Sequence, residues 1–423
     1  MRPFQRQTNY SYQDFLAAFL SQNRRKEKLT KETPIRLRGE RHCSWRATFK
    51  KVDETICLVL CEHTDKSQFI SFYYYGGNYM ENKYFVASNS SEGFCSYYSN
   101  AFDIRKFSKI YSIKGGSGTG KSFFMNEIAK KAEKKGYSIR YIYCSSDSSS
   151  LDGIIIDEPK IAVLDGTAPH IYEPQLVGAV DSIVDLGVFL NGEILSKLRR
   201  QIEGMLTKKK QGFERAYRYL RVYQLLSQSI EELIYPCLKL DKMNRYAKSF
   251  TKNINEGDGN IENRLIRGIG MRGLSSFDTY YNNSKIYYEI NDYCESGHIL
   301  LDMIYRLFSQ KRADMYVSNN PIIKDRFDAL CVPKDGLTFE ITEEEHEGAR
   351  KINMKRFVDV DAVAKIRQEY RIIARLRDDA VDMALFEFEN IKKHHFVLES
   401  IYGSAMDFDA KEKFTEEFCN KIL

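Results

Sequence analysis

The chain has 423 residues, of which 43% are hydrophobic and 29% are charged, so its composition is that of a globular protein with room for two domains. No run of 18 apolar residues occurs, which argues against a helical membrane span, and the N-terminus leads into no apolar stretch of the kind found in secretory signals. Nine irregularly spaced cysteines are typical of a reducing compartment rather than of a disulfide framework. We therefore expect a cytoplasmic protein without a membrane partner.

The net charge of +6 is unevenly distributed along the chain. Residues 1–51 carry thirteen Lys and Arg against four Asp and Glu, whereas residues 342–423 carry fourteen against eighteen. Basic arms of this kind contact nucleic acid or an acidic partner protein, although a solvated surface has the same composition. Alternating and apolar runs between residues 42 and 76 predict strands of a small antiparallel sheet or of an extra layer.

A glycine-rich stretch lies between an apolar run and an amphipathic run. The apolar residues 110–113 predict a buried strand, and the spacing of apolar residues over 123–132 predicts a helix. Strand, glycine-rich turn and helix are the context in which the pattern G-x-x-x-x-G-K-[ST] forms a P-loop. Every position of the pattern is present: Gly115, Gly116, Ser117, Gly118, Thr119, Gly120, Lys121 and Ser122.

The chemistry of this stretch explains each residue type. Glycines allow the backbone to curl so that its N–H groups point at an anion at the start of a helix. The side chain of Lys121 reaches the β- and γ-phosphates, and the hydroxyl of Ser122 ligates Mg²⁺. The sequence therefore predicts a P-loop that binds ATP together with Mg²⁺.

A second Mg²⁺ ligand is expected at the end of a later strand. Residues 161–164 are apolar and are followed by Asp165, where P-loop proteins place an acidic group on the metal side of the site. Asp157 and Glu158 follow another apolar run and are an alternative, but the proline after them favours a hairpin tip. We expect Asp165 to be the metal ligand, through water, and to share the catalytic work with Lys121.

The group that activates water is less evident. Asp165 is followed by Gly166 rather than by the glutamate common in motor ATPases. His170 and Glu173 lie just past the strand, within reach of a γ-phosphate, and His170 is the predicted catalytic residue of the two. A structural or capping role for His170 is the alternative.

Residues 176–250 have a helical pattern that is rich in Lys and Arg. The apolar spacing predicts a long antiparallel hairpin that turns near residues 211–212. Arg215 and Arg218 are candidates for an arginine finger, with a solvated charged face as the alternative. The segment also carries three tyrosines that either stack nucleic-acid bases or pack in a core, namely Tyr217, Tyr219 and Tyr223.

After residue 262 the sequence pattern starts again. Residues 151–156 align without gaps with 327–332, and further matches keep the same order at an offset near 176 residues, which favours an internal duplication. The second copy has lost its phosphate chemistry. Where its P-loop is expected, it has one glycine, no lysine and two acidic residues that repel phosphate, Asp292 and Glu295.

These patterns predict an α/β fold with a mostly parallel sheet, a P-loop NTPase fold that is duplicated, each copy followed by a long helical hairpin. We expect residues 1–83 to form a basic N-terminal extension with a small β-rich region and residues 84–251 to form the P-loop NTPase domain with its hairpin. Residues 252–262 are rich in Gly and Asn and are the predicted linker. Residues 263–423 are the predicted degenerate domain with a C-terminal hairpin.

The P-loop, the stretches Tyr143-Cys144-Ser145-Ser146-Asp147 and Leu151-Asp152-Gly153, and the segment from Leu164 to His170 together resemble an uncharacterised bacterial family of tandem P-loop ATPases. The resemblance covers roughly residues 84–423 and leaves 1–83 as an addition. It implies ATP binding and ATP hydrolysis. In that family both halves tend to carry a P-loop, from which this chain departs.

Three functions are consistent with the sequence. The first is ATP binding with Mg²⁺-dependent hydrolysis that drives a conformational change for the control of a partner protein. The second is a nucleotide or small-molecule kinase, which the pair Asp165-Gly166 and the polar loop 145–150 favour. The third is nucleotide-dependent binding of nucleic acid through the basic N-terminal arm and the helical hairpin, including the lysines at 208–210.

Overall fold

The structure is a computed structural model of the whole chain, and it describes residues 34–38, 44–51, 56–63, 68–74, 82–169 and 172–423. The chain divides into two compact units, Met1–Tyr79 and Met80–Leu423. Within the described residues, no helix combines the length and the apolar character that crossing a membrane requires.

The first unit contains a four-stranded antiparallel sheet in which each strand pairs with the next along the chain. The small antiparallel sheet predicted from alternating residues is therefore confirmed. Most of the basic arm lies outside the described residues. The strands are β1 (Pro34–Arg38), β2 (Ser44–Lys51), β3 (Ile56–His63) and β4 (Gln68–Tyr74).

The second unit contains two six-stranded sheets, and three of the five strand pairings in each sheet are parallel. In order across it, the first sheet consists of β12 (Asp181–Asp185), β8 (Lys109–Lys114), β11 (Ile161–Asp165), β10 (Leu151–Ile156), β9 (Ile139–Tyr143) and β5 (Lys83–Phe85). The second consists of β20 (Arg350–Asn353), β16 (Ile286–Asn291), β19 (Leu337–Ile341), β18 (Phe327–Val332), β17 (Met315–Asn319) and β13 (Ile261–Asn263).

The two sheets have the same strand order and the same pattern of parallel and antiparallel pairs. The agreement extends to two small hairpins, β6 (Ala87–Ser90) with β7 (Gly93–Ser96) and β14 (Arg267–Gly270) with β15 (Gly273–Ser276). Short helices also correspond in position: α2 (Tyr98–Ala101) and α7 (Thr279–Asn282). The 3-10 turns are η1 (Ile104–Lys106), η2 (Leu186–Phe189), η3 (Tyr235–Cys237), η4 (Thr251–Asn253) and η5 (Met354–Phe357).

Each sheet packs against one helix of 14 residues, α3 (Lys121–Lys134) on the first and α8 (Gly297–Gln310) on the second. The buried face of α3 repeats at helical spacing through Phe124, Ile128 and Ala132, none of which is exposed to solvent. The central strand β10 is buried along its whole length, as its run of isoleucines predicts. The strands and the helix predicted on either side of the glycine-rich stretch are thus confirmed.

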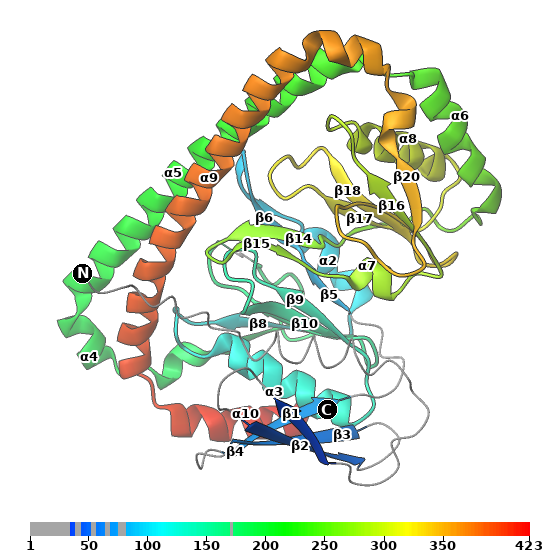
Figure 1. Cartoon of the computed structure of the whole chain (residues 1–423). Coiled ribbons are helices and arrows are strands. Elements are labelled where there is room, and N and C mark those ends of the chain that lie inside the picture. The colour runs from blue at the N-terminus through cyan, green and yellow to red at the C-terminus, as the bar shows by residue number, and fades with distance from the viewer. Residues whose placement is uncertain (1–33, 39–43, 52–55, 64–67, 75–81, 170–171) are drawn as a thin grey trace. The chain divides into compact units, whose positions relative to one another are not determined.

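Two long helices pair with each other (Figure 1). After the short α4 (Gly192–Lys197), α5 (Arg199–Ile234) leaves the first sheet, and α9 (Val360–Ser404) returns from the second sheet alongside it in the opposite direction. The antiparallel sense follows from contacts such as Arg215 with Glu387 and Lys209 with His395.

The hairpin predicted to turn near residues 211–212 is wrong, because α5 runs through these residues without a break. Gly212 marks a close approach of two helices instead of a turn, since a Cβ added there would lie 2.6 Å from Cγ1 of Ile391 on α9. A glycine inside a helix allows such an approach at the expense of helix propensity. Each long helix therefore finds its antiparallel partner in the other half of the unit.

The halves also exchange their short terminal helices. The helix α6 (Leu240–Phe250) follows α5 in sequence, yet its Met243 and Phe250 lie in the core of the second sheet. The helix α10 (Phe408–Ile422) follows α9, yet its Phe418 packs on Phe124 of the first sheet, with ring centroids 5.2 Å apart. The segment predicted as a linker, 252–262, contains the end of η4 and the first two residues of β13.

The strand β12 was not predicted, because it lies in a segment that has a helical pattern. This edge strand is short and has an aspartate at both ends, so it lacks the apolar run that signals a strand. Asp181 is nevertheless buried, because its Oδ2 accepts hydrogen bonds from the backbone N–H groups of Gln175 and Leu176 at 2.8 and 2.7 Å. These bonds fix the start of β12 beside β8.

Candidate functional site

The glycine-rich loop, residues 115–120, joins β8 to α3 at the carboxyl end of the first sheet. Gly118 and Gly120 both have φ of +77°, a conformation that other residues adopt only with strain. Gly120 is the residue from which α3 starts, and its carbonyl accepts the first helical hydrogen bond, from Phe124 N at 2.9 Å. The loop therefore leads straight into a helix N-terminus, where backbone N–H groups are available to an anion.

Lys121 is folded back onto this loop. Its Nζ donates hydrogen bonds to the carbonyl oxygens of Gly115 and Gly116 at 2.9 and 3.0 Å, and lies 3.5 Å from Oδ2 of Asp165. The side chains of Lys121 and Asp165 are each 13% exposed. The ammonium group of Lys121 is thus held over the loop by two carbonyl oxygens and one carboxylate. Phosphate oxygens could replace the carbonyl oxygens as its acceptors.

Asp165 reaches the loop because β11 lies directly beside β8 in a parallel pairing, with Asp165 opposite Ile113. Its Oδ1 accepts a hydrogen bond from Thr167 N at 2.8 Å, which leaves Oδ2 directed at Lys121. The hydroxyl of Thr167 in turn donates to Gly115 O at 3.0 Å. The carboxylate is thus fixed relative to the loop by the residues that follow it.

Ser122 takes part in a backbone contact with the next strand. Leu151 N at the start of β10 donates to Ser122 Oγ at 3.0 Å, so this hydroxyl keeps its own proton and a lone pair for another partner. Thr119 stabilises the loop by donating to Gly116 O at 2.9 Å. Lys121, Ser122 and Asp165, predicted to act together, all line the same cavity.

A cavity of about 910 Å³ opens above the glycine-rich loop. This volume suits a ligand of the size of a nucleotide. Its floor is formed by the loop and the ends of the strands, and its opposite wall by α5 and α9. The lining includes Phe94, Gly116, Ser117, Gly118, Lys121, Ser122, Cys144, Asp147, Asp152, Asp165, Lys209, Lys210, Phe213, Tyr217, Met271, His395 and Glu399.

The end of α9 lies directly on the loop. A Cβ on Gly118 would be 2.6 Å from the carbonyl oxygen of Glu399, and one on Gly116 would be 3.1 Å from the ring of Tyr402. Lys411 of α10 approaches Gly120 in the same way, and burial lowers the pKa of Lys411. The glycines are therefore required by contact with the returning helix as well as by backbone conformation.

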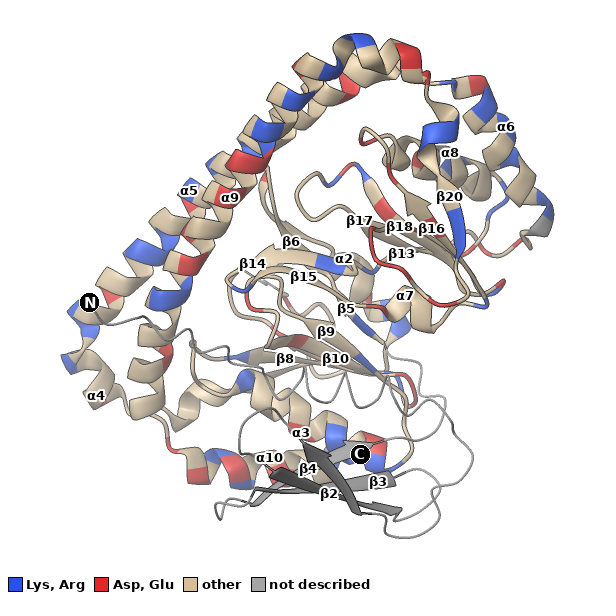
Figure 2. Ribbon diagram, in the orientation of Figure 1, with Lys and Arg blue, Asp and Glu red and all other residues tan. Residues whose placement is uncertain are grey.

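The cations of α5 are not arranged as the sequence suggested. Figure 2 shows Lys and Arg along α5 and α9 with Asp and Glu between them. Arg215, a candidate arginine finger, makes a two-pronged contact with Glu387, its Nε and Nη2 each 2.9 Å from a carboxylate oxygen, and Arg218 is exposed. The cavity is instead lined by Lys209 and Lys210.

Several other sequence candidates lie away from the cavity. His170 falls outside the described residues, and Glu173 is exposed. Asp157 and Glu158 form the tip of the β10–β11 hairpin, at the opposite end of the strands from the glycine-rich loop, as the proline turn predicted. There Asp157 pairs with Arg140 at 2.8 Å.

Gly166 has a packing reason for its identity. A Cβ at this position would collide with Oγ of Ser112 on β8. The absence of a glutamate after Asp165 therefore follows from the close fit of two neighbouring strands. The pair Asp165-Gly166 therefore no longer favours a kinase over an ATPase.

The three tyrosines of α5 pack against the hydrophobic core between the two long helices. Tyr217, Tyr219 and Tyr223 are partly buried against the cluster between α5 and α9, and Tyr217 donates to Oδ1 of Asn89 on β6 at 2.9 Å. Burial raises the pKa of Tyr217. Tyr217 also lines the cavity, whereas the packing of Tyr219 and Tyr223 favours the alternative that they belong to a core.

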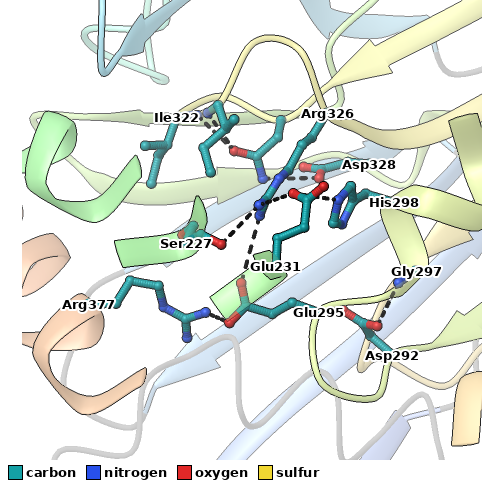
Figure 3. A network of polar contacts seen from close by, with 12 residues as sticks. Ser227, Glu231, Asp292, Glu295, Gly297, His298, Ile322, Arg326, Asp328 and Arg377 are labelled. Atoms are coloured by element: carbon teal, nitrogen blue, oxygen red, sulfur yellow. Dashed lines mark hydrogen bonds and ion pairs between the residues drawn. The ribbon is translucent and has the colours of Figure 1, made fainter. Parts of the chain in front are cut away.

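The corresponding loop of the second sheet, residues 292–296, carries its own acidic groups (Figure 3). Oδ1 of Asp292 accepts hydrogen bonds from the backbone N–H groups of Tyr293 and Gly297, each at 2.8 Å, at the start of α8. Burial raises the pKa of Asp292 against the effect of these donors. The amides that an anion would use in the first loop are thus occupied here by a side chain.

Ion pairs connect this second loop to both long helices (Figure 3). Arg326 donates to Glu231 of α5 at 2.7 Å, and Glu295 of the loop pairs with Arg377 of α9. His298 lies 3.3 Å from the same Glu231, and this contact lowers the pKa of Glu231 to about 2. Arg326 also donates to the backbone carbonyl of Ser227 at 3.2 Å, so the second loop and the residues beside it contact both α5 and α9.

Replacing Asp292 with alanine is expected to lower the free energy of unfolding by about 1 kcal/mol, because the first amides of α8 lose their acceptor. Asp302→Ala on the same helix, which removes an exposed contact with Arg306, is the control and is expected to change it by less than about 0.5 kcal/mol. Urea unfolding of both variants measures the difference. Equal effects would contradict the assignment of Asp292 as the occupant of the loop.

Family models, curated proteins and solved structures were all compared with the chain, and none of them matches it. Two features of the site were not visible in the sequence: the contribution of α9 to the cavity wall, and the position of Lys209 in that wall. Both depend on a pairing between helices that are distant in the chain.

Proposed function

We propose that this protein binds ATP through the loop 115–120, as a P-loop, and hydrolyses it with Mg²⁺. The observation that carries the proposal is the placement of Lys121 and Asp165, 3.5 Å apart, on the floor of a cavity of about 910 Å³ at the N-terminus of α3. A lysine, a helix N-terminus and a carboxylate in this relation suit a polyphosphate and its metal ion.

The residues present are compatible with bound Mg²⁺ and triphosphate. Ser122 and Asp165 line one cavity and have oxygen atoms of the kind that Mg²⁺ prefers. Lys121 would exchange its two carbonyl acceptors for phosphate oxygens, which are charged and therefore stronger acceptors. Mg²⁺ held there would supply charge neutralisation of the phosphates.

The proposed hydrolysis is coupled to α5 and α9. The carbonyl of Glu399 lies against Gly118, and the ring of Tyr402 lies against Gly116. A conformational change in the loop would therefore alter the contact between the loop and α9. Farther along both helices, ion pairs link Glu231 of α5 to Arg326 and Arg377 of α9 to Glu295 of the second loop. We propose that nucleotide turnover moves the end of the paired helices that lies over the cavity, and that this movement controls a partner protein.

Phosphate release with ATP and with GTP, each with and without Mg²⁺, tests the proposal. Wild-type protein is expected to release phosphate only with Mg²⁺, and Asp165→Asn to lower the rate by roughly 10²- to 10³-fold. The matched control is Asp157→Asn, at the other end of the same hairpin, which is expected to keep the wild-type rate. Absence of both nucleotide binding and phosphate release would refute the proposal.

A second candidate is a small-molecule kinase. The cavity continues past the loop to Phe94, Phe213, Tyr217 and Met271, and this apolar region offers room for an acceptor. Transfer of label from γ-labelled ATP to a nucleoside or metabolite pool would favour the kinase. Release of free phosphate without any acceptor would favour hydrolysis.

We further propose that the second unit arose by duplication and belongs with the tandem P-loop ATPases that its sequence resembles. Identical strand order, matching hairpins and helices of equal length support a common origin of the halves. The second loop would then be a former nucleotide site whose anion has been replaced by Asp292.

A further inference from the structure

We infer that Lys209 is a second phosphate-binding cation of this site, supplied by α5 and held on His395 of α9 while no phosphate is present. The inference rests on the proposed function, since it assigns a further residue to the same bound polyphosphate. It identifies a lysine that lies 88 positions from Lys121 in the sequence, outside the glycine-rich motif.

Lys209 differs in burial from its neighbours in the basic run 208–210, because Lys208 and Lys210 are both exposed. Lys208 is exposed and is absent from the cavity wall, whereas Lys209 is partly buried and lines the wall opposite the loop. Burial lowers the pKa of Lys209; the nearby Cys144 and Glu399 oppose this effect, and the charge of Lys121 adds to it. Lys121, Lys209 and the exposed Lys210 all line the cavity.

The cavity is lined by several carboxylates, namely Asp147, Asp152, Asp165, Glu214 and Glu399, yet Lys209 forms no ion pair with any of them. Lys121 has Asp165 at 3.5 Å, but no carboxylate among the described residues lies within ion-pair distance of Lys209. Its hydrogen-bond partner is His395, with Nζ 2.9 Å from Nδ1. A partly buried ammonium group without a paired carboxylate is costly, and an added anion reduces that cost.

The contact with His395 fixes the state of the ring. An ammonium group only donates, so Nδ1 of His395 must accept, and the ring proton therefore lies on Nε2. This nitrogen is 3.4 Å from Oε1 of Glu399, which orients the imidazole. Lys209 is consequently held by a neutral acceptor, which is weaker than a charged phosphate oxygen.

A polyphosphate in the cavity would therefore take Lys209 away from His395. The exchange matters for the helices because the bond it breaks joins α5 to α9. It is broken beside Glu399, whose backbone lies on Gly118 of the loop. Phosphate binding and the pairing of the helices meet at this one contact.

Calorimetric titration of the full chain with tripolyphosphate and with ATP tests the inference. Lys209→Gln is expected to weaken both affinities by roughly 10- to 100-fold, the effect of losing one charge-assisted hydrogen bond. Lys209→Arg is expected to restore most of the loss. Lys208→Gln removes the same charge from the adjacent exposed position and is expected to bind within about 2-fold of wild type.

His395→Ala distinguishes a phosphate ligand from a structural lysine. Without the competing acceptor, Lys209 is expected to bind tripolyphosphate about 2- to 10-fold more tightly. If Lys209 only stabilised the helix pair, this variant would weaken binding, and that result would overturn the inference.

The inference and the proposed function fail in different ways. If wild type binds, Lys121→Ala does not, and Lys209→Gln binds as well as wild type, the inference is wrong while the nucleotide site stands. If wild type binds neither tripolyphosphate nor ATP, both are wrong. Thermal unfolding of Lys209→Gln, expected near the wild-type temperature, confirms that a loss of binding does not reflect a loss of fold.

Discussion

Replacing Lys121 with alanine is expected to weaken ATP binding by at least about 100-fold and to reduce phosphate release by a similar or larger factor. The ammonium group of this residue is held at the mouth of the glycine-rich loop by Gly115, Gly116 and Asp165. Without it, the phosphates would lose a charge-assisted donor that faces them from the loop. Equilibrium titration and single-turnover phosphate release measure the two effects.

Lys134→Ala is the matched control for this variant. Lys134 is the last residue of the same helix and is exposed, and it takes no part in the cavity wall. Its replacement is expected to leave binding and turnover within about 2-fold of wild type. If the two variants bind ATP equally well, the loop does not hold the phosphates.

Replacing Phe388 with alanine is expected to lower the free energy of unfolding by about 3–5 kcal/mol. This side chain of α9 is fully buried and meets Phe213 of α5 edge to face, with ring centroids 6.1 Å apart. Its neighbours belong to both long helices and to β14. Movement of one helix therefore cannot fill the space that the alanine substitution leaves. Urea unfolding measures the loss.

Phe386→Ala removes the same atoms two positions away and is the control. Phe386 is 60% exposed, so we expect a change in unfolding free energy of less than about 0.5 kcal/mol. The difference between the two variants isolates burial in the helix pair. A small effect of Phe388→Ala would mean that α5 and α9 do not pair as described.

Local features of the site could be predicted from the sequence because neighbouring residues produce them. The strand before Gly115, the helix after Lys121 and the carboxylate at the end of β11 each depend on a short run of residues. The relation between Lys121 and Asp165 then follows from the parallel pairing of two strands. For this part of the molecule, the sequence pattern predicts the same arrangement of residues as the structure shows.

The opposite wall could not be predicted, because it depends on contacts across the whole chain. Lys209 and His395 are 186 residues apart, and both lie on helices whose surfaces are rich in charge. The spacing of apolar residues in α5 and α9 indicates that each segment is a helix, but it does not indicate which segment each helix packs against. The glycine at 212 looked like a turn because its packing against Ile391 is invisible in the sequence.

The exchange of terminal helices sets an order for folding during synthesis. The helix α3 buries Phe124 against α10, which is formed by residues 408–422. The second sheet receives α6 from residues that precede it, so it can be completed as soon as it leaves the ribosome. The first sheet must wait on the order of tens of seconds for the last helix of the chain. The loop that is proposed to bind ATP would therefore be among the first parts synthesised and the last to become functional.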